Sequence, residues 1–195
     1  MPAIQLLKQR IREEGVVKKG NVLKVDSFLN HRIDTQLLDA IGEEFYRLFA
    51  DAGVTKIVTI EASGIGVAVM AARYFGVPVV FAKKAKTAQL DDEFYAARIH
   101  SFTHNNDYTA IISRKYLSAE DTVLVIDDFL ANGEATRGLL AILDDAGAKL
   151  AGVGIVIEKG FQGGGDKLRA EGIRVESLAL IDSMDWETGE IVFRE

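Results

Sequence analysis

The sequence predicts an α/β fold, in which a doubly wound parallel sheet carries an antiparallel hairpin flap. Three observations lead to this prediction. Short apolar runs rich in β-branched residues alternate along the chain with longer segments whose apolar residues have helical spacing. Two strand patterns separated by a helix imply a right-handed parallel crossover. Two alternating segments joined by a polar turn imply the hairpin.

Length and composition limit the class of protein. With 195 residues the chain has the length of one sizeable domain, and we expect a single domain over residues 1–195. The absence of cysteine excludes a disulfide framework and a thiolate nucleophile. A formal net charge of -6 argues against nucleic acid as the main partner. No apolar stretch is long enough to span a membrane and the N-terminus is charged, so we expect a cytoplasmic protein.

The N-terminal part of the chain predicts two amphipathic helices. Residues 3–14 have apolar side chains at helical spacing. Residues 22–31 show no clear period and give no assignment. From Asp34 or Thr35, the two candidate N-caps, a strongly amphipathic helix runs to about residue 52.

The α/β core follows. In chain order we expect strands at 56–60 and 78–82 with a helix at 63–74 between them, a polar stretch at 83–98, hairpin strands at 99–104 and 108–113, a strand at 123–126, a helix at 134–146, a strand at 150–157, a Gly-rich turn at 163–165, a short helix to 171 and a strand at 173–181. Trp186 and the C-terminal tail are expected at a sheet edge or a subunit contact.

The most informative stretch is residues 123–138, V-L-V-I-D-D-F-L-A-N-G-E-A-T-R-G. Four apolar residues predict a buried strand, and Asp127 and Asp128 come where that strand leaves the sheet. The small residues of the next turn leave backbone N–H groups free at a helix start, which suits a phosphate. Paired carboxylates suit sugar hydroxyls, a magnesium-bound species or a developing positive charge. An isolated acidic pair more often caps a turn, so the surrounding pattern decides the interpretation.

This stretch resembles the phosphoribosyl-pyrophosphate (PRPP) motif of the type I phosphoribosyltransferases. The resemblance implies that fold, and it implies that the catalytic Asp127 and Asp128 face the ribose hydroxyls while the next loop binds the 5′-phosphate. The loop residues are Ala131, Asn132, Gly133, Glu134 and Ala135. Many members of the family have Thr at the position of Asn132. The sequence of residues 129–135, F-L-A-N-G-E-A, is most similar to the branch of the family that acts on xanthine.

Four further residues are candidates for binding PRPP at its pyrophosphate. Ser63 and Gly64 lie at another strand-to-helix junction, which resembles the pyrophosphate loop of the family; a turn capped by Ser63 is the ordinary explanation. Lys83 and Lys84 resemble the start of the mobile catalytic loop, and one of them is expected on the pyrophosphate. Without the resemblance, a lysine cluster is usually a solvated charge run.

The purine site is expected to combine distant segments. Lys159 and Phe161 follow a buried strand, where the resemblance puts a lysine on a carbonyl oxygen of the base and the chain offers an aromatic ring to stack on it. Residues 1–35 resemble a hood over the base, with Leu23 against the purine and Asn30 within hydrogen-bonding reach of it. A surface lysine, a core phenylalanine and a loop-capping asparagine are the ordinary alternatives.

The combined prediction is a purine-salvage enzyme that converts xanthine and PRPP to xanthosine 5′-monophosphate and pyrophosphate. Mg²⁺ would be carried by PRPP, with no metal site built by the protein. The resemblance implies a homodimer, with no nucleic acid or membrane partner.

Three alternatives to this prediction differ in the base, in catalysis or in the cofactor. The base preference is open, because the contact at position 2 that separates xanthine from guanine and hypoxanthine does not follow from spacing. A PRPP-sensing purine regulator without catalysis would need a DNA-reading module, for which the N-terminal segment is too short. A dinucleotide-binding oxidoreductase is disfavoured, because Val69 stands at the third glycine position of its fingerprint and lysines replace the expected acid.

Overall fold

The computed structural model describes residues 2–85, 93–101 and 106–194. Its elements in chain order are α1 (Ala3–Glu14), β1 (Val16–Lys18), β2 (Val22–Lys24), η1 (Asp26–Asn30), α2 (Thr35–Phe49), β3 (Lys56–Ile60), α3 (Ser63–Phe75), β4 (Val79–Ala85), β5 (Phe94–Ser101), β6 (Asn106–Ser113), η2 (Arg114–Tyr116), β7 (Thr122–Leu130), α4 (Glu134–Ala146), β8 (Lys149–Lys159), η3 (Gly160–Gln162), α5 (Gly164–Ala170), β9 (Val175–Met184) and β10 (Ile191–Phe193).

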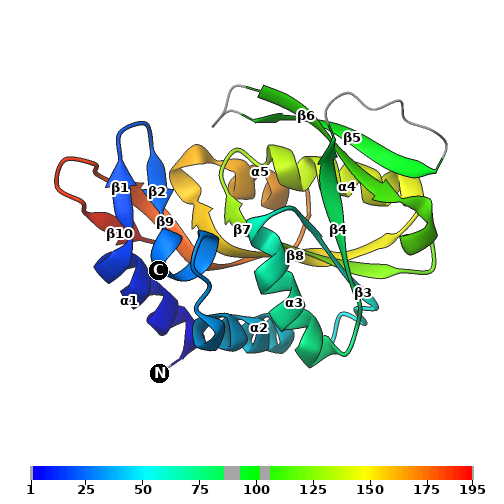
Figure 1. Cartoon of the computed structure of the whole chain (residues 1–195), viewed down its shortest axis with the longest axis horizontal. Helices are drawn as coiled ribbons and strands as arrows, with labels where there is room; N and C mark the ends of the chain where they lie inside the picture. The colour runs from blue at the N-terminus through cyan, green and yellow to red at the C-terminus, as the bar shows by residue number, and fades with distance from the viewer. Residues whose placement is uncertain (1, 86–92, 102–105, 195) are drawn as a thin grey trace.

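A mixed sheet forms the centre of the molecule. Within the described residues its strand order is β10-β9-β8-β7-β3-β4-β6-β5. The five inner strands are parallel, whereas β10 at one edge and β6 and β5 at the other are antiparallel. Helices α1, α2 and α3 lie on one side of the sheet, and α4 and α5 lie on the other (Figure 1). This three-layer arrangement confirms the predicted α/β class.

Strand β7 is buried on both faces. Leu124 and Ile126 pack in the core that includes α1, α2 and α3, whereas Val123 and Val125 pack in the core that includes α4, α5 and the hairpin. All four side chains are fully buried. Successive residues of a strand point to opposite faces, so a continuous apolar run is what a central strand between two helical layers requires.

Several predicted elements have their predicted bounds. The helix at 3–14, the strand at 56–60 and the helix at 134–146 are all present. Of the two candidate N-caps of α2, Asp34 is the residue that acts: its carboxylate accepts hydrogen bonds from the backbone N–H groups of Gln36 and Leu37, both at 3.1 Å. The unassigned stretch 22–31 forms β2 and the short helical turn η1, and β2 pairs with β1 in a hairpin.

Two central strands are longer than predicted. β7 does not end at Ile126 but continues through the acidic pair to Leu130, and β8 continues to Lys159. The two extensions pair with each other, with Leu130 opposite Glu158. Hydrogen bonding between strands far apart in the sequence therefore overrides the polar character of the acidic pair.

The segment 83–98, predicted as a polar stretch, was also predicted incorrectly in part. Lys83 and Lys84 belong to β4, which runs to Ala85, and β5 begins at Phe94 inside the predicted polar stretch. The end of β4 pairs with β6, so the hairpin continues the edge of the sheet. The predicted hairpin turn at 105–107 is wrong in part, because Asn106 and Asp107 already belong to β6; residue 105 lies outside the described residues.

The C-terminal elements also differ in their bounds. α5 begins at Gly164, inside the predicted Gly-rich turn, and β9 runs from Val175 to Met184. The tail forms β10, which pairs with β9 and confirms the expectation of an edge. Trp186 is 51% exposed.

Candidate active site

The loop between β7 and α4 lies at the carboxyl end of the parallel strands. Its turn needs glycine, because Gly133 has a φ of 93° in the left-handed region. A pocket of about 190 Å³ is lined by the continuous run 129–136, together with Ile99, His100 and Tyr108 of the hairpin. The predicted phosphate-loop residues therefore form one pocket, and the hairpin closes one side of it.

Helix α5 fixes the shape of this loop. The backbone N–H of Gly164 donates to the carbonyl oxygen of Ala131 at 3.1 Å. A Cβ atom at position 164 would lie 2.3 Å from that oxygen and 2.8 Å from the backbone nitrogen of Gly133. A side chain at 164 would displace the loop backbone, so the loop conformation depends on a glycine that lies far from it in the sequence.

The acidic pair lies on β7, shortly before the loop that leads into α4. Asp127 is 5% exposed, and its carboxylate accepts a hydrogen bond from the backbone N–H of Asp128 at 2.9 Å. Burial, and next the nearby charge of Asp128, raise the pKa of Asp127 well above its ordinary value, although Lys84 acts in the opposite direction. A buried carboxyl with a perturbed pKa is typical of a functional site.

The start of α3 contacts this acidic pair. A Cβ atom on Gly64 would lie 2.8 Å from a carboxylate oxygen of Asp127 and 2.3 Å from the hydroxyl of Thr59. Two motifs that are distant in the sequence thus meet at the same sheet edge. The ordinary alternative for this junction, a turn capped by Ser63, is not what the structure has: Ser63 is the first helical residue, Ala62 occupies the N-cap position, and no side chain caps the helix.

The two candidate lysines lie on opposite faces of β4. Lys84 has its ammonium 5.1 Å from the ring centroid of Tyr108 and acts electrostatically on Asp127. Lys83 instead lines a groove on the other face with Phe81 and Tyr116. Alternation along a strand explains the separation. Lys84 is therefore the lysine that the structure brings to the acidic pair.

Tyr108 is a site residue that the sequence reasoning missed. It lines the pocket of the phosphate loop, and burial followed by the charge of Asp127 raises the pKa of its hydroxyl. The alternation of side chains along β6 was the sequence signal that could have identified it, since alternation puts Tyr108 on the same face as Ala110. In the structure Ala110 pairs with Lys84 of β4, so Tyr108 and Lys84 share that face.

A second pocket, of about 380 Å³, lies on the other side of the loop. Leu23 and Asn30 from the N-terminal segment line it with Lys159, so three predicted residues from distant segments meet there. Phe161, the fourth predicted residue, is not among its lining residues and is 37% exposed. The aromatic side chain that lines this pocket is Phe129.

Lys159 is held at the rim of this second pocket. Its ammonium donates a hydrogen bond to the carbonyl oxygen of Asn21 at 2.8 Å and lies 5.5 Å from the ring centroid of Phe129. Burial lowers the pKa of this ammonium. The contact with Asn21 also ties the β1–β2 hairpin to the end of β8.

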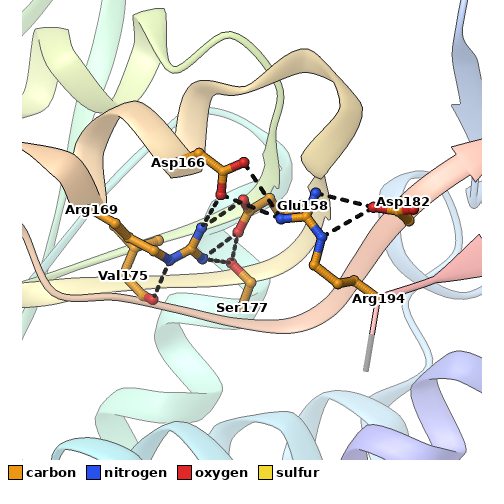
Figure 2. A network of polar contacts seen from close by, with 7 residues as sticks. All are labelled: Glu158, Asp166, Arg169, Val175, Ser177, Asp182 and Arg194. Carbon is orange, nitrogen blue, oxygen red and sulfur yellow. Dashed lines mark hydrogen bonds and ion pairs between the residues drawn. The ribbon is translucent and has the colours of Figure 1, made fainter.

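A buried polar network supports the strand end that carries Lys159 (Figure 2). Glu158 is fully buried, and its two carboxylate oxygens accept hydrogen bonds from the Arg169 guanidinium at 2.9 and 2.6 Å. The Ser177 hydroxyl donates to the same carboxylate. A Cβ atom on Gly165 would lie 2.0 Å from Glu158, so α5 packs directly against this network. The network thus joins β8, β9 and α5 behind the two pockets.

The two pockets share part of their walls. Phe129, Ala131 and Asn132 line both of them. One pocket offers backbone N–H groups at a helix start, which suit an anion. The other combines apolar side chains with a half-buried ammonium and side-chain amides, which suit a flat polar ring. The arrangement fits a ligand that carries a phosphate at one end and a heterocycle at the other.

Comparison with known proteins identifies the class. The family model for the phosphoribosyl transferase domain matches residues 25–185. The protein therefore belongs to the phosphoribosyltransferase family. Within that family it is similar to the xanthine phosphoribosyltransferases. It is 58% identical to the one from Lachnoclostridium phytofermentans, covering 98% of both chains. It is 57% identical to the one from Bifidobacterium longum, covering 98% of this chain and 100% of the other.

Solved structures share the fold at much lower identity. Adenine phosphoribosyltransferase from Rhodothermus marinus aligns with a TM-score of 0.73 and 23% identity, covering 91% of this chain and 97% of that one. The Giardia lamblia enzyme complexed with 9-deazaadenine aligns with a TM-score of 0.74 and 20% identity, covering 89% and 96%. These likenesses establish the type I phosphoribosyltransferase fold.

Proposed function

We propose that the protein transfers the phosphoribosyl group of PRPP to xanthine, producing xanthosine 5′-monophosphate and pyrophosphate. The observation that carries this proposal is the phosphate loop that forms a wall of both pockets, with the acidic pair on the strand that leads into it. A ribose 5-phosphate bound there would be within reach of a base in the second pocket. The curated relatives that share more than half of this sequence are named for xanthine.

The acidic pair would act on the ribose. As pyrophosphate leaves, positive charge develops on the sugar, and preorganised negative groups stabilise that transition state. Asp127 and Asp128 would supply this negative potential and accept hydrogen bonds from the ribose hydroxyls. Residues 131–135 would hold the 5′-phosphate through backbone N–H groups. The backbone at Ser63 and Gly64 and the ammonium of Lys84 would bind the pyrophosphate.

Magnesium is expected to arrive with PRPP. The described residues contain no cluster of three or more acidic, histidine or cysteine side chains that would hold a metal. The carboxylates at the site are a neighbouring pair, which is too small a donor set for a complete protein cage around Mg²⁺. Oxygens of the pyrophosphate and ribose would therefore supply most of the ligands, and the ion would neutralise charge on the leaving group.

The second pocket would hold the purine. Lys159 would donate to a carbonyl oxygen of the base, and Leu23 would pack against the ring. The Asn30 amide would supply both a donor and an acceptor. Phe129 is better placed than Phe161 to provide the aromatic surface, since only Phe129 lines the pocket.

The domain organisation, oligomeric state and cellular location of the enzyme are also proposals. We expect residues 1–195 to act as one domain, with residues 1–35 as a hood over the base. Among the described residues no helix is long and apolar enough to cross a bilayer. We further propose a homodimer that works in the cytoplasm.

A panel of bases tests this function. Xanthine, guanine, hypoxanthine and adenine are each incubated with PRPP and Mg²⁺, and nucleotide product is measured. We expect the highest kcat/KM with xanthine. The Asp127→Asn, Asp128→Asn double variant should retain the fold, judged by circular dichroism, and lose most turnover. A higher kcat/KM for guanine or hypoxanthine would reject the assigned base. Unchanged turnover in the double variant would reject the role of the acidic pair.

A further inference from the structure

Gln162 has an unsatisfied acceptor next to the purine pocket. It is the last residue of η3, directly after the strand end that carries Lys159. Gln162 is one of the residues that line the 380 Å³ pocket, as Lys159 is. Its Oε1 is shielded from solvent and has no hydrogen-bond partner within the described part of the chain. Buried acceptors are normally satisfied, so an unpaired one beside a ligand pocket points to a partner on the ligand.

The local backbone explains why Lys159 and Gln162 share a pocket. Lys159 is the N-cap of the 3₁₀ turn that ends at Gln162. A 3₁₀ helix has three residues per turn, so side chains three positions apart project from the same side. Phe161, between them, is 37% exposed and does not line the pocket. The turn therefore brings Lys159, with its ammonium donor, and Gln162, with its amide acceptor, to the same pocket.

The turn itself is held rigidly. Glu158, which precedes it, is fixed by Arg169 and Ser177 in the network behind the pocket (Figure 2). A Cβ atom on Gly160 would lie 2.7 Å from Leu180, so β9 packs directly under the turn. Support of this kind reduces the conformational entropy lost when a ligand binds.

We propose, resting on the function proposed above, that Gln162 is a specificity-determining residue whose Oε1 accepts a hydrogen bond from a ring N–H of the base. Lys159 donates to the carbonyl oxygen next to that N–H. This pair of contacts recognises the –NH–CO– edge of an oxopurine. Adenine presents the reverse pattern at this edge, a ring nitrogen acceptor beside an amino donor, so it would leave the Gln162 acceptor without a partner and place an amino group against the Lys159 ammonium. A site that hydrogen-bonds its ligand discriminates strongly for this reason.

Two variants test the role of Gln162. Gln162→Leu removes the acceptor with little change in size, and it should raise the KM for xanthine about tenfold while leaving the KM for PRPP within about twofold. Gln162→Glu retains the acceptor and should restore most of the affinity for xanthine. Gln36→Leu, at an exposed position of α2, is the matched control and should match the wild type in both KM values.

The outcomes separate this inference from the proposed function. A wild-type enzyme that forms no nucleotide from any oxopurine rejects both. An active wild type with an unchanged xanthine KM in Gln162→Leu overturns the inference alone. Equal increases in the KM values for xanthine and PRPP, or failure of Gln162→Glu to restore xanthine affinity, would show a structural role and overturn it as well. Binding of xanthosine 5′-monophosphate, measured by calorimetry, gives a second readout that does not depend on turnover.

Discussion

Burial of the Asp127 carboxyl, which the proposed function requires, lowers the stability of the folded protein at neutral pH. Its pKa is raised, chiefly because burial disfavours the charged form. Ionisation therefore costs free energy in the folded state, and this cost is absent at low pH, where the folded and unfolded states are both protonated. The cost grows as the pH rises above the ordinary pKa of Asp and is complete above the folded-state pKa.

Asp127→Asn should accordingly stabilise the protein at neutral pH. The expected gain in Tm declines toward zero as the pH falls below about 4, because the wild-type carboxyl is then neutral in both states. Thermal unfolding from pH 4 to pH 8 measures it. Asp145→Asn, at an exposed position of α4, is the control and should change stability by no more than about 0.5 kcal/mol. A destabilised Asp127→Asn variant at pH 8 would contradict the expectation.

Gly64 is a second residue whose size matters. Gly64→Ala would put a Cβ atom 2.3 Å from the Thr59 hydroxyl and 2.8 Å from Asp127. We expect a loss of about 1–3 kcal/mol of stability from overpacking, together with a rise in the KM for PRPP. Gly66→Ala on the same helix is the control, since its nearest neighbours are the ends of the Ile33 and Leu38 side chains at 3.3 and 3.4 Å. Equal effects of the two substitutions would remove the special role of position 64.

Sequence reasoning reached some site residues and missed others for a physical reason. Leu23 and Lys159 were linked only by family resemblance, because nothing local relates two residues so far apart. Lys83 and Lys84 were not separable, since their faces depend on whether that segment is a strand. Gln162 belongs to no recognisable sequence motif. Its proposed role in base specificity rests on an unpaired Oε1 atom, which the three-dimensional structure shows and the sequence does not.

At the scale of elements, local signals were reliable and long-range pairing was not. α4 has its predicted bounds because Gly133 and Gly147, both with positive φ, delimit a clear amphipathic pattern. The ends of β7 and β4 were missed because polar residues there are kept in the sheet by β8 and β6. The extended ends of β7 and β4 carry Asp127, Asp128 and Lys84 into the candidate active site.

The network around Glu158 should couple stability to base binding. Glu158→Gln removes the charge that pairs with Arg169 in a buried setting, and we expect a loss of about 2–4 kcal/mol from the free energy of unfolding. The KM for xanthine should rise more than the KM for PRPP, because Lys159 follows directly. Chemical denaturation and steady-state kinetics measure the two effects.

A second Glu–Arg pair provides the control for this network. Glu171 accepts two hydrogen bonds from Arg137, at 2.6 and 3.0 Å, but this pair is exposed. Glu171→Gln should therefore change stability little, since solvent screens the charges. If the two substitutions had equal effects on stability, burial would not be the source of the contribution from Glu158.

At the scale of the whole molecule, the groove at the β4–β6 end is the best candidate for the contact in the proposed homodimer. Phe81 and Tyr116 are 39% and 62% exposed there, and with Lys83 they line a groove of about 660 Å³. Exposed apolar surface of this kind is typical of protein–protein contacts. A second copy would cover this groove and bury the aromatic side chains.

Substitution of one aromatic residue tests the position of the dimer contact. We expect analytical ultracentrifugation over a range of concentrations to show a dimer for the wild type and a monomer for Phe81→Glu, because the substitution places a charge in the proposed contact. Trp186→Glu is the matched control, because Trp186 is also exposed, at 51%, but lies near the opposite edge of the sheet. A Phe81→Glu dimer as stable as the wild type would move the contact elsewhere, and dissociation by Trp186→Glu would point to the β9–β10 edge.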